Sequence, residues 1–236
     1  MIELKVLISP VDAFRSAPAL RLRLLRRSFC VLGAVTVLAA LLLTIYSSRV
    51  ISSVQQALSA NQHLSAETLQ DLTGGLKMAK FLSLSTVTVQ ALIFPLCWIL
   101  GTAIITAFSV LSGGAGKFRE LAPLTGFGFI PYIIFLCVAI CLVIALPLNI
   151  DTLAISVARD QKEFIEALKD YKIALNNSVL VLLLLRFNAV FTVWVALLWG
   201  LALQQVEGFS AWKSRILVSC SLGFMYTCSH IAGWFA

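Results

Sequence analysis

Residues 124–148 read LTGFGFIPYIIFLCVAICLVIALPL, without a single charged residue. An α-helix rises ~1.5 Å per residue, so this stretch is long enough to cross the ~30 Å hydrocarbon core of a bilayer. The stretch therefore predicts a membrane-spanning helix.

Four further stretches are also long enough and apolar enough to cross a bilayer. With the first, the predicted spans are 28–48, 84–111, 124–148, 179–203 and 214–235. Hydrophobic residues make up 60% of the chain and charged residues 12%, with a mean hydropathy of +0.95, which excludes a soluble globular protein. The predicted fold is all-α: a polytopic membrane protein in which a basic arm at residues 1–27 precedes one transmembrane domain, a five-helix bundle at 28–236.

Basic residues outside the spans predict the orientation, because short loops rich in Lys and Arg stay in the cytoplasm. Residues 1–27 carry six of them, and the turns after the second and fourth spans carry Lys117 with Arg119 and Lys213 with Arg215. Seven others are spread over two longer loops and are mixed with acidic residues. This predicts a cytoplasmic N-terminus, two cytoplasmic turns and an extracytoplasmic C-terminus, in what we expect to be a bacterial cytoplasmic (inner) membrane.

The basic arm is amphipathic, and Pro10 and Pro18 prevent one continuous helix, because proline costs ~3 kcal/mol in a helix interior. Short interfacial helices would bury its apolar residues and leave the arginines on anionic lipid, at ~1 kcal/mol per charge. Alternatively, the arginines only fix the orientation of the chain. Both interpretations stay open at this point.

The two longer loops, 49–83 and 149–178, are patterned. In the second, apolar residues recur at helical spacing opposite a charged face: Phe164, Leu168, Tyr171 and Leu175. This predicts an amphipathic helix. A weaker pattern follows the first span, and Gly74–Gly75 are predicted to end that helix before the second span. The expected role of these extracytoplasmic helices is a lid over the bundle or an extension of a span, with partner docking as the alternative.

Arg186 is a charged residue inside the fourth span, about 12 Å from its start at helical rise. A charge at that depth costs between ~2.5 and more than 10 kcal/mol, depending on whether it reaches water. One interpretation is a coupling or substrate residue in a hydrated pocket, with Asn149 or Asp151 within reach if the third and fourth spans are neighbours. The other is that Arg186 snorkels to the headgroups. No acidic residue lies inside a span, which argues against a proton relay.

Catalytic and metal-binding signatures are missing. The six cysteines all fall within spans, and although Cys137 and Cys141 share a helix face, neither His63 nor His230 lies at ligand spacing to them. Cysteine in such places packs as a small hydrophobic residue. No hydrolase, zinc-protease, phosphate-loop or dinucleotide-binding motif occurs. We therefore predict no enzyme, no metal, no cofactor and no nucleic-acid partner.

The two short basic turns are the predicted binding region. Glycines before Lys117 allow a tight turn at the membrane surface, and each turn combines an aromatic residue with two basic ones. Such a combination is typical of an interfacial anchor. The residues expected to bind anionic headgroups or a partner are Lys117, Phe118, Arg119, Trp212, Lys213 and Arg215.

The order of these motifs resembles the Yip1 family of five-span membrane proteins, and most closely its short prokaryotic branch. The specific parts are GGAGKF at 113–118, LTGFGFIP at 124–131 and GLALQQVEGFSAWKSR at 200–215. The resemblance covers nearly the whole chain and implies an all-helical bundle with a cytosolic N-terminus. Eukaryotic relatives are associated with Rab GTPases and vesicle traffic, but the arm is too short to form a cytosolic docking domain.

Two functions follow from these patterns. The first is a non-enzymatic accessory or scaffold subunit of a membrane complex, related to trafficking or export by resemblance, which binds lipid and either another membrane protein or itself. Small residues in the second span, such as Gly101 and Ala107, would allow close helix packing. The alternative is a transporter of small solutes or lipid that uses Arg186, with spans broken at Pro95, Pro131 and Pro147.

Overall fold

The computed structural model describes residues 21–146 and 150–234, and their side chains except those of 21–23, 79–80, 82–93 and 224–234. Predictions for the arm up to residue 20, for Pro147 and Asn149, and for the last two residues lie outside this part. The division into an arm at 1–27 and a domain at 28–236 stays a prediction.

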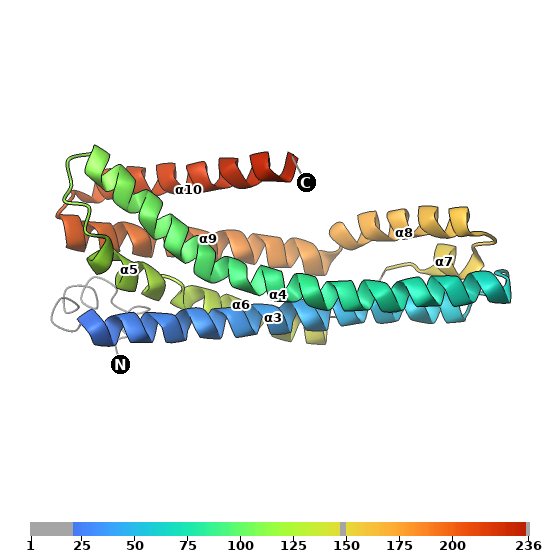
Figure 1. Cartoon of the computed structure of the whole chain (residues 1–236). Coiled ribbons are helices and arrows are strands. Elements are labelled where there is room, and N and C mark those ends of the chain that lie inside the picture. The colour runs from blue at the N-terminus through green and yellow to red at the C-terminus, as the bar shows by residue number, and fades with distance from the viewer. Residues whose placement is uncertain (1–20, 147–149, 235–236) are drawn as a thin grey trace. The chain divides into compact units, whose positions relative to one another are not determined.

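Every regular element in the described part is a helix (Figure 1), which confirms the predicted all-α fold. The helices are α3 (Arg21–Ser59), α4 (Ala66–Leu111), α5 (Phe118–Phe127), α6 (Ile130–Ala145), α7 (Leu153–Val157), α8 (Gln161–Asn176), α9 (Val179–Glu207) and α10 (Ala211–Trp234).

Four segments of the described residues are long and apolar enough to cross a membrane: Leu24–Ser59, Phe94–Leu111, Phe118–Ala145 and Val179–Glu207. They overlap the first four predicted spans, and the chain is an integral membrane protein. The predicted fifth span, 214–235, falls on α10, whose side chains are described only as far as Gly223. Five crossings therefore stay a prediction.

The first two membrane helices continue far beyond their predicted spans. The 39 residues of α3 extend over about 58 Å, roughly twice the hydrocarbon thickness. The predicted helix end at Gly74–Gly75 is wrong, because both glycines lie inside the 46-residue α4. Each glycine costs about 1 kcal/mol in a helix interior. That cost is offset because neighbouring leucines of α4 pack on a buried core: Leu69, Leu72 and Leu76.

Polar side chains mark where several helices begin. The hydroxyl of Ser65 accepts a hydrogen bond from the backbone N–H of Thr68, and the Asp160 carboxylate accepts one from that of Glu163. Ser210 does the same for Lys213. The first N–H groups of a helix have no partner inside it, so such caps stabilise helix starts after residues 65, 160 and 210.

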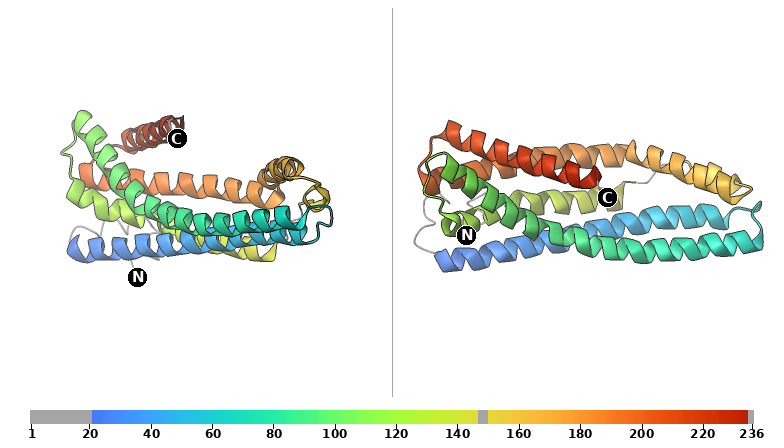
Figure 2. Two further views of the ribbon diagram at one scale, coloured as in Figure 1. Left: turned by 45° about the vertical axis from the view of Figure 1, so that its right-hand side comes forward. Right: turned by 45° about the horizontal axis from the view of Figure 1, so that its top comes forward.

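By their contacts, the residues divide into two compact units. Of the described residues, unit 1 comprises 21–37, 92–135 and 189–234, and unit 2 comprises 38–91, 136–146 and 150–188. Within unit 2, the helical parts of the two predicted loops form what we call the loop module, residues 49–78 and 150–176. There, the end of α3 and the start of α4 run side by side (Figure 2).

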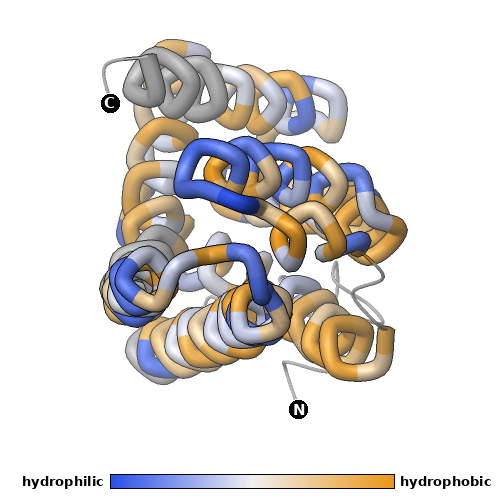
Figure 3. The backbone as a smooth tube through the Cα atoms, turned by 90° about the vertical axis from the view of Figure 1, so that its right-hand side faces the viewer, coloured by the Kyte–Doolittle hydropathy of each residue, from blue (hydrophilic) through white to orange (hydrophobic). Residues whose placement is uncertain are grey.

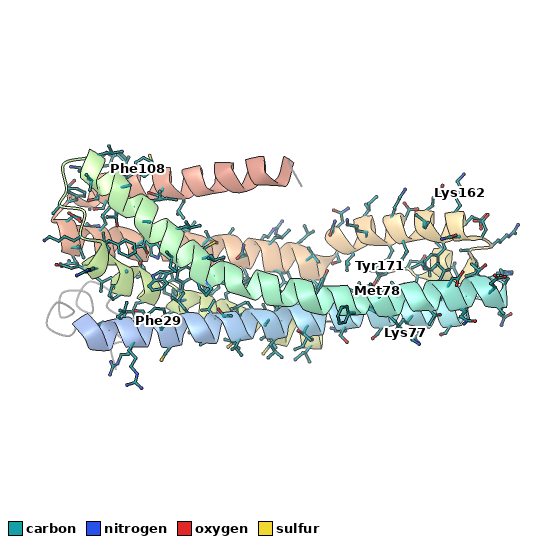
Figure 4. All side chains as sticks on the ribbon, viewed as in Figure 1. Phe29, Lys77, Met78, Phe108, Lys162 and Tyr171 are labelled. Atoms are coloured by element: carbon teal, nitrogen blue, oxygen red, sulfur yellow. The ribbon has the colours of Figure 1, made fainter. Side chains whose placement is uncertain are left out.

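The loop module has its own hydrophobic core. Its buried residues come from α3, from α8 and from α7 with the residue after it: Val54, Ala57, Leu58, Ile155, Ala158, Phe164, Ala167, Tyr171 and Leu175. The predicted amphipathic helix at 149–178 is confirmed, because Phe164, Tyr171 and Leu175 are buried while the charged residues of α8 are exposed. Figure 4 shows Lys162 pointing away from the module and Tyr171 pointing into it. Hydrophilic residues gather in the part of the loop module that contains α7 and α8 (Figure 3).

Asn61 ties the turn between α3 and α4 to α7. This buried amide donates hydrogen bonds from Nδ2 to the carbonyl oxygens of Ile155 and Ala158, at 3.0 and 2.9 Å. Its Oδ1 accepts from the N–H groups of His63 and Leu64, at 2.8 and 3.1 Å. One side chain therefore satisfies four backbone groups from two separate segments.

Arg49 holds the end of α6 within unit 2. Its Nη1 donates hydrogen bonds to the carbonyl oxygens of Val143 and Leu146, the latter at 2.9 Å. Carbonyls at a helix C-terminus have no partner in the helix and carry partial negative charge, so a guanidinium satisfies both needs.

We expect Arg49→Leu to lower the free energy of unfolding by about 1–3 kcal/mol, because two carbonyls lose a charged donor. Arg49→Lys should recover part of this loss. The measurement is the melting temperature of the purified protein in mild detergent, with the exposed Arg159→Leu as the control. Equal melting temperatures for the two leucine variants would contradict the assigned role.

The third predicted span is made by two helices, α5 and α6, which are separated at Gly128–Phe129 within unit 1. The break precedes Pro131, which has no N–H to offer to the carbonyl of Phe127. The break considered at Pro95 is wrong, because that proline lies inside the uninterrupted α4.

Side chains of neighbouring helices donate hydrogen bonds to carbonyl oxygens of α5, on the N-terminal side of this break. Trp98 donates from Nε1 to the carbonyl oxygen of Ala122 at 3.0 Å, and Trp199 donates to that of Thr125 at 2.9 Å. Further bonds join Ser28 Oγ to the carbonyl oxygen of Pro123 at 2.7 Å, and the hydroxyls of Thr102 and Thr125 at 2.8 Å. We call these residues the Thr125 cluster: Ser28, Trp98, Thr102, Thr125 and Trp199. All five side chains are buried.

Candidate functional site

Two turns far apart in the sequence are joined in unit 1. The α4–α5 turn covers residues 112–117 and the α9–α10 turn residues 208–210. Glu207, the last residue of α9, accepts hydrogen bonds from the N–H groups of Ala115 and Lys117, at 2.7 and 2.8 Å. No side chain caps α5 at its own N-cap residue, Lys117. Glu207 therefore supplies, from another helix, the negative charge that a helix start favours.

Lys213 reinforces the same contact from α10. Its Nζ donates a hydrogen bond to the carbonyl oxygen of Ser112 at 2.7 Å and lies 4.0 Å from the centre of the Phe209 ring. A cation over an aromatic face is attracted by ~0.5–2 kcal/mol. The sequence predicts Lys213 as a lipid or partner contact, whereas the structure uses its ammonium group to join the two turns.

Glycine is required in both turns. Gly113 and Gly208 have φ of 82° and 71°, a conformation that other residues rarely adopt. At Gly114 the constraint is space, because an added Cβ would lie 2.7 Å from Cζ of Phe209 and 2.9 Å from Oε2 of Glu207. A side chain at position 114 would displace the side chains of Phe209 and Glu207.

The other five predicted residues face outward from the joined turns. Lys117, Arg119 and Arg215 are exposed, and the aromatic side chains of Phe118 and Trp212 are 39% and 72% exposed. Figure 1 shows α5 and α10 beginning at the end of unit 1 where α4 and α9 finish. We call these five residues the turn surface.

Arg186 lies in the part of α9 that belongs to unit 2. Its side chain is exposed and has no hydrogen bond or ion pair with the described residues. The predicted partner Asp151 instead accepts from the N–H of Leu153 at 2.8 Å. The structure does not bring the two together.

The loop module contains a groove of about 440 Å³ between the start of α4 and α8. This volume falls within the range of ~300–1,000 Å³ that ligand sites occupy. Its lining residues are Thr68, Asp71, Leu72, Gly75, Leu76, Gln161, Phe164, Ile165 and Leu168. A Cβ added at Gly74 or Gly75 would have no neighbour within 4 Å, so both glycines border open space.

Sequence reasoning missed three features: Glu207, the Thr125 cluster and the groove. The first had a usable signal, because an acidic residue ends the fourth span while a glycine-rich turn exposes N–H groups. The other two depend on pairing between distant segments, which one sequence does not reveal. Among the described side chains, no three His, Cys, Asp or Glu residues lie close enough to hold a metal ion.

Comparison with family models gives a match that covers almost the entire chain. The family described as the Yip1 domain matches residues 4–232, which include nearly all of the helices α3 to α10. No curated protein and no solved structure matches the chain.

Proposed function

This chain belongs to the Yip1 domain family, and on that premise we propose that it is a non-enzymatic accessory or scaffold subunit of a membrane complex. Its partner is another membrane protein, bound through the groove of the loop module. The turns and the N-terminus are cytoplasmic and the loop module is extracytoplasmic, in a bacterial inner membrane, as the basic residues predict.

The observation that carries this proposal is the glycine pair inside α4. Each glycine costs about 1 kcal/mol in a helix interior, and the space beside each is open. No contact with the described residues explains why a side chain is absent there. Glycine lets another backbone approach closely, and Gly75 also lines an apolar groove. A partner helix or segment seated on Gly75 accounts for both facts.

The transporter alternative has less support. A substrate or coupling role for Arg186 needs a hydrated pocket around the guanidinium. The side chain is instead exposed on α9, which favours snorkelling to the headgroups. It also does not line the groove of the loop module.

The test compares Gly75→Leu with Gly74→Leu. At both positions an added Cβ has no neighbour within 4 Å and leucine raises helix propensity, but only Gly75 lines the groove. We expect Gly75→Leu to reduce the amount of co-purified membrane protein at least about tenfold in mild detergent, as the loss of one buried contact does. Gly74→Leu should retain the partner. Quantitative mass spectrometry of the purified complexes gives the ratio.

Two outcomes would contradict the proposal. One is that both variants recover the same proteins in the same amounts as the native chain. The other is that the protein alone moves a solute into liposomes and that Arg186→Ala abolishes this movement, which would favour the transporter.

A further inference from the structure

The turn surface presents three exposed basic side chains beside two exposed aromatic ones. The membrane segments Phe94–Leu111, Phe118–Ala145 and Val179–Glu207 begin or end at these turns, so the surface lies at the edge of the bilayer. Phosphate groups of anionic lipid carry the complementary charge at that depth, and tryptophan prefers the headgroup layer. Charge and position thus favour lipid as the occupant.

Acidic groups compete little with lipid for these bases. Glu207 is half-buried and directs both carboxylate oxygens to the N–H groups of Ala115 and Lys117. Glu120, the other acidic residue nearby, is also half-buried, in the first turn of α5. The positive charges of Lys117, Arg119 and Arg215 therefore lie outermost.

We infer that the turn surface is an organised binding site for anionic phospholipid headgroups, in which Glu207 acts as a positioning residue. Lys117, Arg119 and Arg215 bind the phosphate, while Phe118 and Trp212 lie against the glycerol and upper acyl region. Glu207 does not touch lipid. It joins the two turns, so that bases from α5, α10 and the α4–α5 turn act on one headgroup.

The alternative to an organised site is unspecific attraction of anionic lipid by the positive charges, here called a diffuse field. The two explanations predict different effects of Glu207→Gln on lipid affinity. Glu207→Gln removes one negative charge and so makes the net charge more positive by one, and a diffuse field would therefore bind anionic lipid more strongly. An organised site would bind it less strongly, because a glutamine side chain has one acceptor oxygen for two N–H donors. The two explanations therefore predict opposite signs.

The experiment titrates the full-length protein in mild detergent with phosphatidylglycerol, and separately with neutral phosphatidylcholine, and counts bound lipid by native mass spectrometry. For the triple variant Lys117→Gln/Arg119→Gln/Arg215→Gln we expect phosphatidylglycerol to bind on the order of 100-fold more weakly, from about fivefold per base. Glu207→Gln should weaken it several-fold. Phosphatidylcholine binding should be similar for all variants.

The matched control removes three exposed bases from α8, as Lys162→Gln/Lys169→Gln/Lys172→Gln. We expect it to retain phosphatidylglycerol binding within about twofold. Equal losses in the two triple variants, or unchanged or tighter binding in Glu207→Gln, would overturn the inference.

If Glu207→Gln does not fold, the comparison of the two triple variants tests whether the turn surface binds the lipid. A turn variant that keeps its lipid but loses a co-purified protein would assign the surface to a protein and overturn the lipid site. None of these variants alters Gly75, so this site and the partner groove can fail independently.

Discussion

Gly128→Ala is expected to lower the free energy of unfolding by about 2–4 kcal/mol, because the added methyl group has no room at the break between α5 and α6. Its Cβ would lie 2.6 Å from Cδ1 and 2.7 Å from Nε1 of Trp199, and 3.0 Å from the carbonyl oxygen of Thr125. Trp199 is buried and would have to move, which breaks its 2.9 Å hydrogen bond to Thr125. The estimate adds the strain of overpacking to the loss of one buried hydrogen bond.

Unfolding by sodium dodecyl sulfate, followed by circular dichroism of the purified protein in mixed micelles, measures this difference. Gly200→Ala is the matched control, because it lies inside α9 and its added Cβ has no neighbour within 4 Å. That variant should be as stable as the native chain or up to about 1 kcal/mol more stable. If both alanine variants unfold at the same detergent fraction, the added methyl group at position 128 does not displace Trp199 and the prediction is wrong.

The second large effect concerns Asn61. Asn61→Asp keeps the oxygen that accepts from His63 and Leu64 but removes the amide that donates to Ile155 and Ala158. A carboxylate would then face two buried carbonyl oxygens. We expect the loop module to lose about 3 kcal/mol, with α7 released from the α3–α4 turn, because both carbonyls lose their donor in a buried place.

Amide hydrogen exchange detects this opening locally. About 3 kcal/mol corresponds to exchange more than 100-fold faster in α7 and the first turn of α8. The exposed Asn176→Asp, in α8, makes the same chemical change without a buried partner and should leave these rates nearly unchanged. Unaltered protection of α7 in Asn61→Asp would show that the four hydrogen bonds do not hold the module together.

Features that depend on local periodicity could be predicted from the sequence. The first four spans follow from long, predominantly apolar stretches, and the buried face of α8 follows from the spacing of Phe164, Tyr171 and Leu175. The turn surface could also be predicted, because aromatic and basic residues next to a span prefer the headgroup layer. Of the six residues predicted in the two turns, five are exposed and form the turn surface, while Lys213 is half-buried and contacts Ser112 and Phe209.

Features that depend on pairing between distant segments could not. Gly74 and Gly75 favour a helix end locally, but leucines on the same part of α4 pack on residues of α8 that lie far along the chain. In the same way, the hydrogen bonds of the Thr125 cluster join α3, α4, α5 and α9, and nothing near any one of these residues in the sequence identifies its partners. The sequence treats Pro95 and Pro131 as equal candidates for a helix break, but only Pro131 follows one. There, Gly128 and the packing of Phe129 on Trp199 occur next to the proline.

The hydrogen bond of Trp199 has a consequence for hydration inside the bilayer. Backbone carbonyls at a helix break in a bilayer need a donor, and water often supplies it. Thr125 is one of the last residues of α5, and its carbonyl oxygen accepts from the indole N–H of Trp199 as well as from the backbone N–H of Gly128. Phenylalanine at position 199 would leave that side of the carbonyl to a water molecule, so the tryptophan keeps this part of the span dry.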